Sequence, residues 1–537
     1  MGRRGRAART RRKESAGRVN RTAVILAVIA LLTGAAVLTA LARLPAEQPW
    51  EANRPDRPAE AEPGPDADPV AIPAPRSWQP EHGPGWGLGG TTRVVADPGG
   101  PLAAEADRLA GELGVDRSAE PARPGDIELA LRSDPRHGEE GYTLVSRSGF
   151  VTVTAGTEAG VFYGTRTLLQ NVRENGGLAE GVIRDAPDRP QRGLLLDVAR
   201  KHLPAEWIED RLHEMAGLKL NQLQLHLTDD QGFRIESETH PEVVSDPHLT
   251  KDEIRSIIDL AESLHITVIP EIDSPGHLGA VLKAHPGLQL RDTGGRAAPG
   301  AIDISDPRAA ELVDGLLREY AGLFPGPLWH LGGDEYRALD AADPEASYPK
   351  LAARAEEKYG PGAGVRDLAT GWLNDRADVV RELGRTPEVW NDGMHRGGVV
   401  APDAERHVAY WTGREIGARP PEEYLAEGRP LVNFNSAYLY YVLGEPVGFV
   451  YPTGEAIYRE WAPLVLRGSE PVPEEYAGSV LGARFAVWCD LSEAQTAEEV
   501  AEGIRLPLRA FAQKVWNPAD PEAEWEEFTG LADRLGE

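Results

Sequence analysis

The sequence predicts a (β/α)₈ TIM barrel over residues 189–537, preceded by a small α+β accessory domain over residues 86–188. The barrel is predicted by a recurring unit, in which a short apolar run is followed by polar residues and then by an amphipathic stretch. Eight such runs are expected to be strands: Leu194–Val198, Gln222–Leu227, Thr267–Ile272, Leu328–Leu331, Glu388–Trp390, His407–Trp411, Leu431–Phe434 and Arg484–Trp488. Eight strands alternating with helices are typical of a TIM barrel. An open doubly wound sheet is the alternative, but no glycine-rich phosphate loop follows the first run.

Helices are expected between these runs. Thr250 and Glu253 form a capping box at the start of one helix, which then has a single apolar face made of Ile254, Ile257, Ile258, Ala261 and Leu264. In the accessory domain we expect helices at Leu102–Leu113 and Val161–Leu169 and strands at Ile127–Leu131, Tyr142–Arg147 and Phe150–Ala155. A sheet with two helices indicates an α+β domain.

The N-terminal region has the composition of an export segment. Residues 1–22 are rich in arginine, and an uncharged run from Ala23 to Ala42 follows. About 20 apolar residues span a bilayer as a helix, and the basic flank stays cytoplasmic. Residues 23–43 are therefore expected to be a transmembrane anchor, which the length favours, or a signal cleaved after Ala40-Leu41-Ala42. Residues 44–85 are rich in proline, alanine and acids and are expected to be an extended linker, with the folded domains outside the cytoplasm.

Charge and cysteine content narrow the possible functions. The net charge is −28, although the first residues are strongly basic. An acidic body repels nucleic acid, so we expect no nucleic-acid partner and a neutral or cationic substrate. Cys489 is the single cysteine, so neither an internal disulfide nor a cysteine metal cluster can form.

Polar and aromatic residues recur where the predicted barrel strands end. They are Asp197, Arg200, His226, Asp229, Asp230, Gln231, Glu271, Asp273, His277, Asp334, Glu335, Trp390, Trp411, Asn435, Tyr438 and Trp488. Functional side chains of a TIM barrel come from the carboxyl ends of its strands. Aromatic faces pack on pyranose rings and carboxylates transfer protons, so the set indicates a carbohydrate site. Taken singly, each tryptophan could equally be core packing, and His226 could be a barrel-interior histidine.

Gly332-Gly333-Asp334-Glu335 is the most informative local motif. Neighbouring residues on a strand point to opposite faces, so two adjacent acids serve one substrate only if the chain bends. The two glycines permit that bend. Repulsion between the acids, together with burial, should raise one of the two pKa values, as a general acid requires.

At this point the sequence resembles glycoside hydrolase family 20, the β-N-acetylhexosaminidases. In the accessory domain the resemblance is carried by Glu140–Leu144 and by GVFYGTRTLLQ at Gly160–Gln170. In the barrel it is carried, in order, by Arg192–Asp197, LNQLQLHLTDDQGFRIES (Leu220–Ser237), IPEIDSPGH (Ile269–His277), HLGGDEY (His330–Tyr336), VWNDG (Val389–Gly393) and NFNSAYLYY (Asn433–Tyr441).

The resemblance implies retaining hydrolysis assisted by the substrate's own acetamide group, without a metal or a cofactor. Glu335 would protonate the glycosidic oxygen and Asp334 would orient the acetamide, whose carbonyl oxygen Tyr438 would bind. The remaining implied roles concern the walls of the site: Trp390, Trp411 and Trp488 would enclose the acetamide, Arg192 would bind sugar hydroxyls, and Asp229 and His277 would support the ionisation of Glu335.

Two positions depart from the pattern common in the family. The last strand ends in Trp488-Cys489-Asp490, where many members have Trp-x-Glu and use the glutamate to bind the outer hydroxyls of a terminal sugar. Asp490 is a shorter acid, and Tyr440 stands where many members have another acid. Both changes leave room for a larger first subsite, as in lacto-N-biosidases, or for a β-1,6-linked glucosamine polymer.

Two other classes of function stay open. A metal-dependent hydrolase could use His226, Asp229, Asp273, His277 and Asp334, although no pair has helical ligand spacing and the tryptophans would have no role. An inactive glycan-binding protein is the other class, but it would usually have lost the acid, and Glu335 is present.

Overall fold

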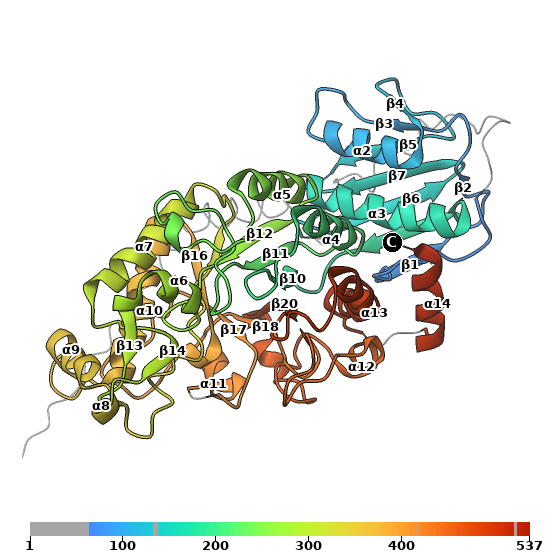
Figure 1. Ribbon diagram of the computed structural model, residues 1–537. Helices are drawn as coiled ribbons and strands as arrows, with labels where there is room; N and C mark the ends of the chain where they lie inside the picture. Colours follow the sequence, from blue (N-terminus) through green and yellow to red (C-terminus); the bar gives the residue numbers. More distant parts are fainter. Residues whose placement is uncertain (1–63, 133–137, 416, 520–522, 537) are drawn as a thin grey trace, which may run out of the picture. The chain divides into compact units, whose positions relative to one another are not determined.

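The computed structural model describes residues 64–132, 138–415, 417–519 and 523–536 (Figure 1). The expected N-terminal basic and membrane-spanning segments, residues 1–43, lie outside the described residues, as do residues 44–63 of the expected linker. Within the described residues, no helix is both long and apolar enough to cross a bilayer.

Within the described part of the chain, eight parallel strands close into a barrel. They are β10 (Gln191–Asp197), β11 (Gln222–His226), β12 (Thr267–Glu271), β15 (Leu328–His330), β16 (Thr386–Trp390), β17 (His407–Tyr410), β18 (Leu431–Asn433) and β20 (Val480–Trp488). The ring closes because β20 pairs with both β18 and β10. A ninth, short strand, β19 (Tyr440–Val442), also pairs with β20. The prediction of a TIM barrel is confirmed, and each predicted strand overlaps an observed one.

Helices connect the barrel strands (Figure 1). They are α4 (Ala205–Gly217), α5 (Lys251–Ser263), α6 (Gly279–Ala284), α7 (Pro307–Ala321), α8 (Pro344–Ser347), α9 (Pro349–Tyr359), α10 (Val365–Glu382), α11 (Pro421–Ala426), α12 (Gly454–Glu460) and α13 (Ala497–Trp516), with α14 (Trp525–Leu535) at the end. Short 3-10 turns are η2 (Pro241–Val243), η3 (Pro286–Leu288), η4 (Asn391–Gly393) and η5 (Glu474–Ser479), and β13 (Gln289–Arg291) pairs with β14 (Ala297–Ile302). The predicted capping box is present in α5, where Thr250 Oγ1 accepts from the Glu253 amide and Glu253 accepts from the Thr250 amide.

The accessory domain is a seven-stranded mixed sheet with two helices, as far as the described residues show. Its strand order is β1-β9-β6-β7-β5-β3-β4. The strands are β1 (Ser77–Pro80), β3 (Arg93–Val95), β4 (Asp116–Ser118), β5 (Ile127–Leu131), β6 (Tyr142–Arg147), β7 (Phe150–Ala155) and β9 (Gly181–Asp185), with α2 (Ala103–Leu113), α3 (Glu158–Asn175) and the small pair β2 (Trp86–Gly87) and β8 (Gly177–Leu178). The α+β prediction is confirmed.

This domain begins earlier in the sequence than predicted. Residues up to 85 were expected to belong to a linker, yet β1 pairs with β9, and Ala71 and Ile72 are buried. The Ile72 amide donates to Gln170 Oε1 at 2.7 Å, on α3. Proline and acid content suggested an unfolded segment, but a few apolar side chains and an extended backbone are enough to anchor it.

Buried charges join the accessory domain to the barrel. Arg192, at the amino end of β10, is fully buried and donates to both carboxylate oxygens of Glu140, at 2.7 and 3.1 Å. Lys219 pairs with Asp185 at 3.2 Å in the same contact. The expectation that Arg192 binds sugar hydroxyls is therefore wrong, because its side chain lies at the opposite end of the strand from the carboxyl end and is fully occupied by the domain contact.

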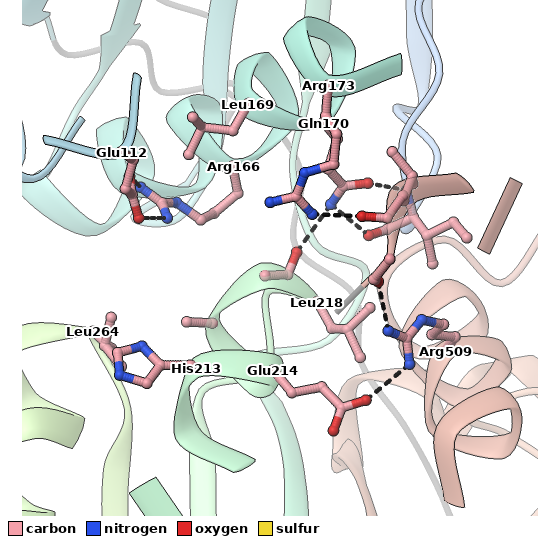
Figure 2. Close-up of a pocket in the computed structure, with 15 residues that line it drawn as sticks. Glu112, Arg166, Leu169, Gln170, Arg173, His213, Glu214, Leu218, Leu264 and Arg509 are labelled. Carbon is pink, nitrogen blue, oxygen red and sulfur yellow. Dashed lines mark hydrogen bonds and ion pairs between the residues drawn. The ribbon is translucent and has the colours of Figure 1, made fainter. Parts of the chain in front are cut away.

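A cavity of about 300 Å³ lies at the same junction (Figure 2). Its lining comes from α3, from the end of α4 and from α13. Arg166 bonds with Glu112 at 2.6 Å, and Arg509 bonds with Glu214 at 2.8 Å. Leu218, which also lines it, follows α4 and lies four residues before the start of β11. The cavity is therefore near the amino ends of the barrel strands, away from the end where TIM barrels carry out chemistry.

Candidate active site

A separate pocket opens at the carboxyl ends of the barrel strands. Its lining residues are Arg200, His226, Asp229, Asp273, His277, Asp334, Glu335, Trp390, Trp411, Tyr440, Val442, Phe449, Trp488 and Asp490. All the residues to which the family resemblance gave a role, except Arg192 and Tyr438, are in this set. Of the other polar residues expected at the strand ends, Asp197, Asp230, Gln231, Glu271 and Asn435 are not part of the lining. The eight strands thus bring together residues that lie up to 290 positions apart.

The backbone bends sharply where the acid pair begins. Gly332 and Gly333 have φ of +65° and +102°, and Glu335 itself has φ of +45°. A side chain on Gly332 would overlap Asp273. The Gly333 amide donates to Asp273 Oδ1 at 2.8 Å, and the Glu335 amide donates to Asp392 Oδ2 at 3.3 Å. The bend predicted from the two glycines is present, and it presents both acids to one pocket.

His277 connects Asp334 with Asp229. Its Nε2 lies 3.5 Å from Asp334 Oδ2, and its Nδ1 lies 3.3 Å from Asp229 Oδ2. Burial opposes ionisation of Asp334, but the charge and hydrogen bond of His277 outweigh it, so the pKa of Asp334 lies below its usual range. For His277 the balance is similar: burial lowers its pKa, while Asp229 and Asp334 raise it well above the usual value. The arrangement therefore holds an anion at Asp334 beside a cationic imidazole.

The pKa of Glu335 moves in the opposite direction. Burial and then the charge of Asp334 raise it, while His277 and Arg337 lower it by smaller amounts. His277 Nε2 is 3.8 Å and Arg337 is 3.4 Å from Glu335 Oε2. Two adjacent carboxyl groups with pKa values shifted apart can act as an acid and as an anion at the same pH.

Two further buried acids flank Asp334. For Asp273 and for Asp392, burial and then the charge of Asp334 raise the pKa well above its usual range. Both are thereby more readily protonated than an ordinary aspartate, and a protonated carboxyl can donate a hydrogen bond. The charge of Asp334 thus disfavours ionisation of both neighbouring acids.

The three tryptophans form walls of the pocket, and polar partners fix two of them. Trp390 Nε1 donates to Glu271 Oε1 and Trp411 Nε1 donates to Asp392 Oδ1, each at 2.9 Å. Trp488 packs edge-to-face on His226, with ring centroids 5.1 Å apart. Core packing was an equal possibility for each tryptophan, but all three line the pocket.

Tyr440, and not Tyr438, reaches this pocket. The Tyr438 hydroxyl donates to Glu460 Oε2 at 3.1 Å, whereas Tyr440 lies on β19 and stacks on Trp411 at 5.8 Å with an interplanar angle of 5°. Burial and the charge of Asp334 raise the pKa of Tyr440 well above its usual value. The expectation that Tyr438 contacts the substrate therefore does not fit its position, because the chain turns after Asn435 before β19 begins.

Two pocket residues had no signal in the sequence. Val442 shares a strand face with Tyr440 because residues two apart on a strand point the same way, but a three-residue strand is too short to detect by alternation. Phe449 comes from the irregular segment after β19 and stacks on Tyr440 at 6.2 Å.

Comparison with known proteins gives the family. The sequence model described as "Glycosyl hydrolase family 20, catalytic domain" matches residues 190–519, and that described as "Glycosyl hydrolase family 20, domain 2" matches residues 68–186. The chain belongs to glycosyl hydrolase family 20. The resemblance found from the sequence motifs is thus confirmed.

Relatives within family 20 differ in length and in name. A lacto-N-biosidase of Bifidobacterium bifidum is 31% identical over 477 residues, which cover 87% of this chain and 42% of the relative. A β-hexosaminidase of Vibrio furnissii is 29% identical, over 68% of this chain and 64% of its own. The chain thus spans less than two thirds of either relative. A β-N-acetylhexosaminidase of Cellulomonas fimi is 28% identical over 86% of this chain and 92% of its own length.

Solved structures agree on the fold. A mutant β-hexosaminidase of Streptomyces plicatus in complex with the product GlcNAc superposes with a TM-score of 0.70 at 23% identity, covering 89% of this chain and 95% of that one. Most of this chain, and nearly all of that one, therefore share one fold.

Proposed function

We propose that the protein is a retaining glycoside hydrolase that releases β-linked N-acetylhexosamine units from glycans by substrate-assisted catalysis. The observation that carries the proposal is the pair Asp334 and Glu335, bent into one pocket with pKa values shifted in opposite directions. Membership of family 20 supports it. Most glycosidases use two carboxylates of the protein, and family 20 is an exception in which the substrate supplies the nucleophile.

In the first step, the carbonyl oxygen of the 2-acetamido group forms a bond to C1 as the bond from C1 to the glycosidic oxygen breaks. Glu335 gives its proton to the departing oxygen. Asp334, kept anionic by His277, accepts a hydrogen bond from the acetamide N–H and stabilises the positive charge that develops on the oxazolinium ring. The Tyr440 hydroxyl donates to the acetamide oxygen and orients it for attack.

In the second step, ionised Glu335 takes a proton from water, whose oxygen attacks C1 and reopens the ring. This restores both the acetamide and the acid, with the β configuration retained. Trp390, Trp411 and Trp488 enclose the acetamide and exclude water that would otherwise compete with the internal attack. Adjacent acids suit this mechanism because the nucleophile belongs to the substrate and need not come from across the ring.

A second candidate concerns the size of the unit that is released. Where a terminal sugar would need acids to bind its outer hydroxyls, this pocket has Val442 and Phe449, with Asp490 as a shorter acid. Burial raises the pKa of Asp490, and Asp197 and Asp229 add to that, although Arg200 opposes it. We infer a pocket that accepts a disaccharide ending in N-acetylhexosamine, and the similarity to a lacto-N-biosidase supports this choice.

The place of action belongs to the same proposal. The basic head and the uncharged run in residues 1–43 support export, with the enzyme body outside the cytoplasm as an anchored or secreted protein. A glycan substrate is compatible with the acidic net charge of the chain.

Glu335→Gln removes the acid while keeping the shape of the side chain. We expect kcat on a chromogenic β-N-acetylglucosaminide, or on the corresponding biosides, to fall at least about 10³-fold, because proton donation and water activation are both lost. EDTA should leave the wild-type rate unchanged. Unchanged turnover by the variant would remove Glu335 as the acid, and inhibition by EDTA would favour a metal-dependent hydrolase built on Asp273, His277 and Asp334.

Arg337→Gln should move the alkaline limb of the pH–rate profile upward. Activity requires protonated Glu335 and is lost as pH rises through its pKa, and the positive charge of Arg337 lowers that pKa. Because Arg337 is half exposed and its charge is screened by solvent, the upward shift is expected to be small. Arg337→Lys keeps the charge and should leave the limb in place; a downward shift in the glutamine variant would contradict the assignment.

Tyr440→Phe and Tyr438→Phe remove the same atom at two nearby positions. The first variant should lose about 10- to 100-fold in kcat/KM, the worth of one hydrogen bond in the transition state. The second should change kcat/KM less than about threefold, because its hydroxyl bonds with Glu460. The reverse order of losses would restore Tyr438 to the site.

A substrate panel separates the two candidate sizes of the released unit. The purified protein would be assayed on chromogenic β-glycosides of GlcNAc, GalNAc and lacto-N-biose (Galβ1-3GlcNAc). The disaccharide pocket predicts at least about tenfold higher kcat/KM for the bioside. Equal or higher kcat/KM for a monosaccharide would assign exo-hexosaminidase action instead.

A further inference from the structure

Two histidines and a glutamate converge on the loops that follow β11 and β12, outside the pocket described above. His240 immediately precedes η2, and His285 lies between α6 and η3. His240 Nδ1 is 3.1 Å and His285 Nε2 is 2.9 Å from the same oxygen, Glu242 Oε1. The two imidazole rings are 6.0 Å apart, at an angle of 82°. The three ligand atoms all lie within 4.8 Å of one another.

We propose that His240, Glu242 and His285 form a binding site for a zinc ion that ties the loop after β11 to the loop after β12. Two imidazole nitrogens and one carboxylate oxygen are a common ligand set for Zn²⁺, which then takes water as its fourth ligand. The side chains are 24%, 45% and 27% exposed, so solvent reaches the fourth position.

The backbone that carries the ligands is fixed on both loops. The His240 amide donates to Ser237 Oγ at 2.9 Å, and Ser237 donates in turn to Glu319 on α7 at 2.7 Å. On the other loop, the His285 amide donates to the Val281 carbonyl at 3.0 Å and the His285 carbonyl accepts from Leu288 at 2.9 Å. Ligands on a fixed backbone need little reorganisation to take up an ion, which favours binding over a chance surface contact.

Binding at this place would stabilise the two loops that deliver catalytic-pocket residues. The first loop carries Asp229, and the second carries Asp273 and His277. The loops already touch through Asp230, which accepts from the Gly279 amide at 2.9 Å. A metal ion at their outer ends would act on stability and not on the chemistry, since none of its ligands lines the pocket.

The test uses the full chain with any affinity tag removed, freed of metal by a chelator and then exposed to ZnCl₂. Zinc that remains after gel filtration is measured by elemental analysis, and thermal unfolding is followed with and without zinc. We expect the wild type to retain a single ion per chain and to show a rise in Tm that grows with zinc concentration. Co²⁺ in place of zinc should give the visible absorption of a four-coordinate ion.

His285→Ala and Glu242→Gln should lose the bound ion, the rise in Tm and the cobalt absorption. His213→Ala removes another exposed histidine, on α4, and should behave as the wild type. Circular dichroism of the metal-free variants checks that they fold; if one does not, the other carries the test. No retention by the wild type, or equal retention by the wild type and His285→Ala, would overturn the proposal. Retention that persists in His285→Ala with loss of hydrolysis would place the ion at Asp273, His277 and Asp334, and would also overturn it.

Discussion

The negative charge of Asp334 is the constraint on which the rest of the site depends. It lies in a buried pocket, where an isolated carboxylate would be strongly disfavoured. His277 stabilises the anion, and Asp229 in turn stabilises the cationic form of His277. Burial, and then this same charge, raise the pKa values of Glu335, Asp273 and Asp392. A single fixed charge thereby prepares both the general acid and the group that stabilises the cationic intermediate.

Side chains inside the barrel support the residues of the pocket. Glu271, at the end of β12, accepts from Gln224 at 2.8 Å and from Trp390 at 2.9 Å, and it also pairs with His226 and His330 at 3.2 and 3.1 Å. Burial and these neighbours together leave the pKa of Glu271 well below its usual value, since His330 and His226 outweigh the cost of burial. The walls of the pocket and its charged floor are therefore parts of one hydrogen-bonded network.

The sequence predicts best what depends on local patterns, and less well what depends on distant partners. Polar and aromatic residues recur where the apolar runs end, so the sequence alone places Asp334, Glu335 and the tryptophans at one end of a barrel. The role of Arg192 could not be predicted in this way. Its partner, Glu140, belongs to the accessory domain, and the contact between the two is seen only in the folded chain. The sequence favoured Tyr438 over Tyr440 as the tyrosine of the pocket. The position of Tyr440 depends on β19, a short strand that forms by pairing with β20. His240 and His285 lie on different loops, and neither lies at a helical spacing that would suggest a shared ligand.

Dependence of the rate on the acetamide group itself tests most directly whether the nucleophile belongs to the substrate. Chromogenic substrates would be prepared with mono-, di- and trifluoroacetamido groups in place of acetamido, and kcat/KM would be measured for each with the wild-type protein. Fluorine withdraws electron density from the carbonyl oxygen, so internal attack predicts a steep fall in kcat/KM with each fluorine added. If kcat/KM is independent of fluorine content, the nucleophile comes from the protein or from water, and the roles assigned to Asp334 and Glu335 are wrong.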